Sequence, residues 1–290
     1  MLKIIESVGK NGKNQISDVK KIRVLLNCYL RSKSKTGLII SGKADINLEE
    51  AIALFQKDYV GSSKPDSKID VNGKSYNKLK EFLNSIFKPV ALSPPTYGIV
   101  TWESEGAEGG PYHSRKLHVP STSSGLTLGR GYDFRRKSQS KIYNDLTSSG
   151  VDAKIATILK QASELFGVSA SQFVIDKDLL DLQISGEVQK NLFKISYDIE
   201  KSEVKRICEK ALVKKTYGTT DWSGLHSTIK DMAIDLKFRG DYTPSARKII
   251  QKSIAENNLT EFKKKIKDKR NWSNVPPDRF IRRSSFMDKT

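Results

Sequence analysis

The residues of this 290-residue sequence that could do chemistry include a polar, glycine-rich segment from Gly125 to Phe134. The segment alternates with period two, so an extended strand would place Thr127 and Asp133 on one face with only glycines between them. Such a face makes a poor core and suits the floor of a sugar site. Because six residues of straight strand span about 20 Å, we expect Gly129 and Gly131 to bend it. The alternative is a plain hairpin in which the glycines serve only the turn.

A second chemical feature lies upstream, where residues 97–106 predict a short helix with Glu105 in its last turn. The helix dipole disfavours a carboxylate at that end, and burial against Trp102 would disfavour it further, so both effects would raise its pKa. A raised pKa suits a general acid that protonates a glycosidic oxygen. The alternative is a solvated carboxylate at a helix end. Glu103 and Glu108 are close enough in the sequence to compete for the role.

Together these residues resemble a known family. The Glu-Gly pair at 105–106, followed by Gly-Leu-Thr-Leu-Gly-Arg-Gly-Tyr-Asp at 125–133, is similar to the catalytic region of phage-type lysozymes and of pesticin. The closest similarity is to the muramidase domains of secreted antibacterial effectors, which the connecting residues 112–120 also resemble. In some phage enzymes the carboxylate precedes the threonine, whereas here it follows.

The resemblance implies a role for each residue. Glu105 would protonate the glycosidic oxygen, while Asp133 and Thr127 would hold or activate the water. Arg130 and Tyr132, in the same motif, are the expected substrate-binding residues. The resemblance implies no cofactor and no metal ion.

The prolines of the chain predict two domains. Three prolines within residues 88–96 predict a linker, since proline continues neither a helix nor a central strand. We therefore expect one domain over residues 1–87 and a second, which carries the candidate catalytic residues, over residues 97–290.

The N-terminal domain shows three apolar helical stripes, which we expect to begin at Asp18, Asn47 and Ser75. It resembles the peptidoglycan-binding-like fold. The motifs that carry this resemblance are Ser7-Val8-Gly9, Asp18-Val19 with Leu25-Leu26-Asn27, Ala51-Ile52 with Phe55-Gln56, and Ile69-Asp70-Val71-Asn72-Gly73. The alternative is a generic three-helix domain without affinity for cell walls.

The second domain is helical in pattern apart from the glycine-rich segment. Residues 231–236 resemble a later core helix of the lysozyme-like family, and Trp272 with residues 276–283 resembles its closing segment. The expected helices are Lys154–Phe166, Leu179–Leu192, Ile199–Val213, Leu225–Phe238 and Ser245–Lys267. The expected fold class is α+β and predominantly α-helical: a lysozyme-like domain with a small β-hairpin, behind a small three-helix peptidoglycan-binding-like domain.

The net charge of the chain indicates which kind of partner it binds. Lysine and arginine total 51 against 33 acidic residues, a net charge of +18, which favours polyanionic partners. No nucleic-acid recognition motif is present, so a nucleic-acid-binding protein has only the charge in its support. The basic run over residues 263–270 can equally be one solvated face of a surface helix. No apolar run approaches the roughly 20 residues that span a membrane.

Other reactive residues give weaker signals. His113, His118 and His226 lack the spacing of a metal site, so we expect surface or hydrogen-bonded structural histidines. Cys28 and Cys208 each fall in an apolar helical stripe, which favours two buried thiols over a disulfide.

The resemblance therefore implies a muramidase that cleaves the β-1,4 bond between N-acetylmuramic acid and N-acetylglucosamine. Residues 1–13 lack the apolar core of a secretory signal. We expect synthesis in the cytoplasm and action in the periplasm or wall of a target cell, after dedicated secretion or lysis. The expected partners are peptidoglycan and either an immunity protein or a secretion-system carrier, without specific nucleic-acid binding or membrane insertion. The alternatives are a non-catalytic wall-binding protein and the same fold acting on chitin or chitosan.

Overall fold

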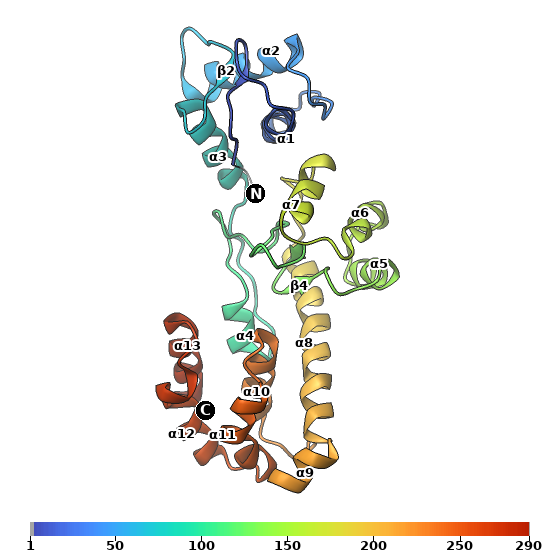
Figure 1. Cartoon of the computed structure of the whole chain (residues 1–290), viewed down its shortest axis with the longest axis vertical. Coiled ribbons are helices and arrows are strands. Elements are labelled where there is room, and N and C mark those ends of the chain that lie inside the picture. The colour runs from blue at the N-terminus through green and yellow to red at the C-terminus, as the bar shows by residue number, and fades with distance from the viewer. Residues whose placement is uncertain (1–2, 290) are drawn as a thin grey trace. The chain divides into compact units, whose positions relative to one another are not determined.

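The computed structural model describes residues 3–289 (Figure 1). The described residues are mostly helical and hold two small antiparallel sheets of two strands each, which confirms the α+β, predominantly helical class. It forms two compact units. The first unit combines Met1–Ala91 with Ala107–Gln189, and the second combines Leu92–Gly106 with Lys190–Thr290.

The N-terminal part of the first unit holds the three expected helices. They are α1 (Ile16–Ser32), α2 (Ile46–Phe55), which continues as the π-helical turn η1 (Gln56–Val60), and α3 (Lys74–Ile86). The strands β1 (Val8–Gly9) and β2 (Lys68–Ile69) pair antiparallel. The ring of Tyr29 packs edge-on against Phe55 and Phe82, at centroid distances of 5.1 and 5.6 Å. The apolar stripes of these helices therefore pack together in one core.

The expected helix starts are wrong by one to two residues. The side chain of Asp18 is fully buried inside α1, where Oδ2 accepts hydrogen bonds from the backbone N–H groups of Ile5 and Glu6. Asp45, rather than Asn47, caps α2. Gly73 precedes α3, so Ser75 lies within the helix.

The rest of the first unit surrounds the glycine-rich segment. Its elements are β3 (Thr127–Leu128), β4 (Tyr132–Asp133), α5 (Gln139–Ser148), α6 (Ala153–Leu159), the 3-10 turn η2 (Lys160–Ala162) and α7 (Gly167–Asp176). The expected helix over residues 154–166 ends early, and α5 and α7 lie outside the expected helices. Helix α5 buries only two apolar residues, Ile142 and Leu146, that could mark it in the sequence.

Ion pairs join α1 to the residues that follow α7. Arg31 contacts Asp178 and Asp181, at 2.8 and 2.6 Å, and the Asn27 amide donates to Asp178. These contacts place the N-terminal helices in one compact unit with residues 107–189. The linker expected at residues 88–96 is inferred from the prolines of the sequence. The domain boundaries that it implies stay a prediction.

All regular elements of the second unit within residues 92–106 and 190–289 are helices. Its elements are α4 (Ile99–Ser104), most of α8 (Gly186–Cys208), α9 (Ala211–Tyr217), α10 (Ser227–Arg239), α11 (Pro244–Ala255), α12 (Leu259–Lys267), the 3-10 turn η3 (Lys269–Trp272) and α13 (Pro277–Asp288). Its core includes Trp102, Phe193 and Met232.

Two expected helix boundaries in this region are wrong. The stripes over residues 179–192 and 199–213 belong mostly to the single helix α8, which begins only at Gly186. The stripe over residues 245–267 is divided between α11 and α12, because Asn257 adopts a left-handed conformation with φ of 50°.

Both cysteines are free and buried, as expected. Among residues 3–289, no helix is long and apolar enough to span a membrane.

Candidate functional site

The glycine-rich segment is a hairpin in which Thr127 pairs with Asp133 and Leu128 pairs with Tyr132. Gly129 and Gly131 form its turn with φ of 64° and 84°, in the region that glycine enters at little cost. The backbone is therefore the hairpin given as the alternative to a bent strand, and its turn reverses the chain at the two glycines. Directly opposed residues of an antiparallel pair project from the same face, so the hairpin brings Thr127 and Asp133 together.

Backbone contacts fix the Asp133 carboxylate. Oδ1 accepts the N–H of Arg135 at 2.7 Å, and Oδ2 lies 3.4 Å from the N–H of Gly125. A Cβ atom on Gly125 would lie 2.3 Å from Oδ1, so only glycine lets the carboxylate approach this closely. The Thr127 hydroxyl donates to the Gly125 carbonyl at 3.3 Å. Asp133 remains partly exposed, whereas Thr127 is 4% exposed.

His118 extends this pair into a row of three residues. Its backbone exchanges two hydrogen bonds with Thr127, at 2.8 and 3.0 Å, on the edge of β3 away from Asp133. Its Nδ1 lies 3.1 Å from the Lys116 carbonyl, so a proton on Nδ1 leaves Nε2 as the acceptor. Burial lowers the pKa of His118, against the opposing effects of that carbonyl and of Asp133.

The sequence interpretation treated His118 as structural, because its position beside Thr127 depends on a bridge between residues nine positions apart. The resemblance over residues 112–120 was the only signal that could have found it.

Arg130 and Tyr132, the residues expected to bind substrate, are both buried. Tyr132 has no exposed surface: its hydroxyl donates to Asp145 at 2.8 Å and its ring packs edge-on against Phe134. Burial and Asp145 raise the pKa of Tyr132. Arg130 is 6% exposed. The contacts of Tyr132 assign its side chain to the packing of the hairpin, while substrate binding by Arg130 stays a prediction.

Glu105 lies at the C-terminal end of α4, as expected, and belongs to the second unit, whereas Thr127 and Asp133 belong to the first. Gly98 precedes the helix with φ of 61°, and its N–H donates to Asp231 at 3.0 Å. A Cβ on Gly98 would lie 2.5 Å from the Tyr197 ring. The start of the helix that carries Glu105 is therefore held in place by α8 and α10.

An ion pair orients the Glu105 carboxylate. Oε1 accepts Nη1 of Arg279 at 2.6 Å, and the Glu105 side chain is 22% exposed. The Glu105 carboxylate thus contacts a cation and not the Trp102 ring, which is the contact expected from the sequence. The Trp102 ring packs against Phe193 instead. Within residues 3–289 no hydrogen bond to Oε2 is found, so one oxygen is fixed while the other remains available.

Arg279 belongs to a network of buried charges. It contacts Asp235 through Nη2 at 2.6 Å, and Asp235 accepts Nε of Arg283 at 2.7 Å. Arg283 also pairs with Asp241 at 2.8 Å. Burial alone would lower the pKa of Arg279, but Asp235 and Glu105 raise it, so Arg279 keeps its charge.

The competing glutamates have different surroundings. Glu103 is exposed. Both oxygens of Glu108 are occupied, by Nε of Arg115 at 2.9 Å and by the Gln189 amide at 3.0 Å. Glu105 is therefore the strongest of the three candidates for a proton donor, since it alone combines a fixed orientation with a free oxygen.

We expect acidification to destabilise the first unit through His113. This histidine is fully buried, Nδ1 accepts the Gly109 N–H at 2.7 Å, and burial and Arg115 lower its pKa. Because the unfolded chain binds the proton at higher pH, stability should fall as the pH drops below about 6.5. Thermal melts between pH 7 and pH 5 measure this. In His113→Asn, whose amide oxygen can replace Nδ1, the decrease should be smaller; an equal decrease would contradict the assignment.

Among residues 3–289, no group of three or more histidine, cysteine and acidic side chains is arranged to hold a metal ion.

Among curated proteins, none matches the chain. A family model described as "Domain of unknown function (DUF8812)" matches residues 98–284, which is more than half of the chain. The matched region includes Glu105, Thr127 and Asp133 and begins next to the start of the expected second domain. The chain therefore belongs to the family described as Domain of unknown function (DUF8812).

Proposed function

We propose that this chain is a muramidase of lysozyme-like fold that hydrolyses the β-1,4 bond between N-acetylmuramic acid and N-acetylglucosamine. The observation that carries the proposal is the pairing of Thr127 with Asp133 across a glycine turn. It puts a hydroxyl and a partly exposed carboxylate side by side, on a segment whose residue types resemble the catalytic region of this enzyme class.

Glycoside cleavage needs one carboxylic acid and one ionised carboxylate. In the proposed reaction Glu105 gives its proton to the glycosidic oxygen as the bond to the anomeric carbon breaks. A water oxygen then takes the place of the leaving sugar. Asp133 stabilises the developing positive charge or activates that water, and the Thr127 hydroxyl orients it.

The N-terminal helices and the charge of the chain support a polymeric, anionic substrate. A net charge of +18 favours association with peptidoglycan carboxylates. We propose that residues 1–87 contribute wall affinity, and that the protein acts as an antibacterial effector or lysin on the wall of a target cell.

Mass spectrometry of peptidoglycan after digestion tests the reaction. We expect fragments with a reducing N-acetylmuramic acid end. Anhydro-sugar ends would indicate a lytic transglycosylase, and freed peptides would indicate an amidase or peptidase. Chitin digests serve as a second substrate. Wild-type protein that releases no reducing ends from the peptidoglycan of several species would contradict the muramidase proposal, whatever its affinity for the wall.

Asp133→Asn should lower the rate of release of reducing ends by about 10²-fold or more, because the amide carries no charge and cannot take a proton. Thr127→Ala should lower it less, since the hydroxyl only orients water. Neither change should weaken co-sedimentation with purified wall. Asp70→Asn, at an exposed carboxylate of the same unit, is the control. Full activity of Asp133→Asn would remove Asp133 from the mechanism.

A further inference from the structure

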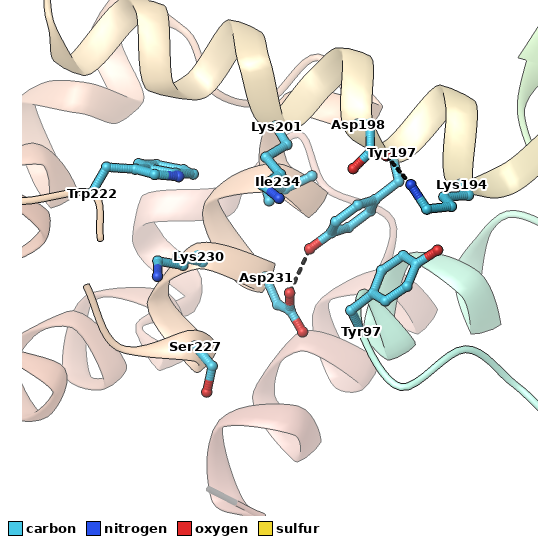
Figure 2. A pocket seen from close by; sticks show the side chains of 10 residues that line it. All are labelled: Tyr97, Lys194, Tyr197, Asp198, Lys201, Trp222, Ser227, Lys230, Asp231 and Ile234. Atoms are coloured by element: carbon cyan, nitrogen blue, oxygen red, sulfur yellow. Dashed lines mark hydrogen bonds and ion pairs between the residues drawn. The ribbon is translucent and has the colours of Figure 1, made fainter. Parts of the chain in front are cut away.

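The second unit contains a cavity of about 320 Å³ that neither Glu105 nor its ion-pair partners line. It lies between α8 and α10 (Figure 2). Positions spaced by three, four and seven residues share one face of a helix, and α8 contributes residues from Lys194 to Lys201 in this spacing. In the same spacing, α10 contributes residues from Ser227 to Ile234. Two helix faces therefore form the walls of the cavity.

Aromatic rings form a large part of the lining. Tyr97 and Trp222 come from the segments before α4 and α10 and are both partly exposed. Tyr97 lies 5.2 Å from the buried ring of Tyr197, whose hydroxyl points to Asp231 (Figure 2). Aromatic faces offer apolar surface to a flat or ring-shaped ligand.

The two carboxylates of the cavity are already occupied. Asp231 accepts the Tyr197 hydroxyl on one oxygen and the Gly98 N–H on the other. Burial and Asp231 raise the pKa of Tyr197, so this hydroxyl keeps its proton. Asp198 accepts the Lys194 ammonium at 2.6 Å. Asp198 is therefore neutralised by Lys194, whereas Asp231 accepts only neutral donors and keeps its negative charge in the lining.

Two further lysines of the lining, Lys201 and Lys230, form no ion pair within residues 3–289. Lys230 donates to the Ser223 carbonyl at 3.1 Å, which supplies no negative charge. Lys201 is exposed, and within residues 3–289 no ion pair or hydrogen bond to its ammonium is found. Three lysines and two aspartates line the cavity and leave one positive charge in excess. Together with the aromatic surface, this charge makes the cavity complementary to a monoanion that carries a ring.

We propose that this cavity is a second, non-catalytic ligand site that binds a single carboxylated sugar unit. The ring packs on Trp222, and the carboxylate lies between Lys201 and Lys230. Its volume is at the lower end for small-molecule sites, which suits one sugar rather than a chain. The choice of N-acetylmuramic acid, whose lactyl group carries the carboxylate, rests on the proposed function. The site would hold the glycan while cleavage takes place at Glu105.

Tryptophan fluorescence of the full chain tests the site directly. Of the three tryptophans, Trp102 and Trp272 are buried, so a ligand in the cavity should act mainly on Trp222. N-acetylmuramic acid has no bond that a muramidase cleaves, so its titration is independent of catalysis. We expect a saturable change with this sugar, and at least tenfold weaker binding of neutral N-acetylglucosamine, because a charged hydrogen bond is lost. Trp222→Phe should remove the signal.

Lys201→Ala should weaken N-acetylmuramic acid binding about tenfold, whereas Lys215→Ala, at an exposed lysine of α9 outside the cavity, should not change it. Equal responses to the two sugars would overturn the proposed recognition of the carboxylate. Displacement by inorganic phosphate at equal concentration would show a general anion site instead of a sugar site. If the chain binds the sugar saturably but cleaves no glycan, the proposed function is overturned and the ligand site is retained. If the chain cleaves glycan but does not bind the sugar, the ligand site is overturned and the proposed function is retained.

Discussion

Replacing Glu105 with Gln should lower the rate of peptidoglycan cleavage by about 10²–10⁴-fold, because the amide keeps the shape of the side chain but has no acidic proton to donate. The amide oxygen can still accept from Arg279, and Arg279 keeps its ion pair with Asp235. The fold should therefore persist. Release of reducing ends measures the loss of activity, and circular dichroism with a thermal melt verifies the fold.

Glu103→Gln is the matched control, since it changes an exposed glutamate two residues away on the same helix. It should retain activity close to wild type. Full activity of Glu105→Gln together with an inactive Glu103→Gln would move the general acid by two residues. Glu108→Gln should instead lower stability, because Arg115 would lose its charged partner at 2.9 Å.

Local patterns of the sequence were sufficient to predict a reversal of the chain at Gly129 and Gly131 and the position of Glu105. Alternating residues with two glycines predict a bent strand, and the observed turn has positive φ at Gly129 and Gly131. A short helix ending near Gly106 predicts a carboxylate at its C-terminal end, and α4 places Glu105 there. Both features depend on the conformations of a few neighbouring residues, which the residue types restrict.

Partners distant in the chain could not be predicted in this way. Arg279 is 174 residues from Glu105, and no local pattern marks it as the cation that orients a carboxylate. The same is true of Asp18, whose acceptor role depends on the backbone N–H groups of residues 5 and 6. The sequence interpretation assigned it to a helix cap because aspartate is common there.

The grouping of the N-terminal helices with residues 107–189 also depends on distant contacts. The prolines of residues 88–96 show where regular structure stops, and α3 does end at Ile86. They carry no information on which surface the helices contact. That information lies in pairs such as Arg31 with Asp178, 147 residues apart.

Arg283→Met should lower the free energy of unfolding by about 3–5 kcal/mol, because it leaves one negative charge in excess around the buried carboxylate of Asp235. Arg283 is 2% exposed and contacts both Asp235 and Asp241. Arg282→Met is the matched control: the neighbouring side chain is partly exposed and lies 3.4 Å from an exposed aspartate. Its effect should stay within about 0.5 kcal/mol. Equilibrium denaturation in urea measures both variants.

A double variant separates an unpaired charge from a lost contact. In wild type, three arginines (Arg239, Arg279, Arg283) balance three acids (Glu105, Asp235, Asp241). Arg283→Met leaves one negative charge in excess, whereas Asp235→Leu with Arg283→Met leaves Arg279 with Glu105 and Arg239 with Asp241. If the unpaired charge is the main cost, the double variant should be more stable than Arg283→Met alone. A double variant less stable than both single variants would show instead that the geometry of the contacts stabilises this unit.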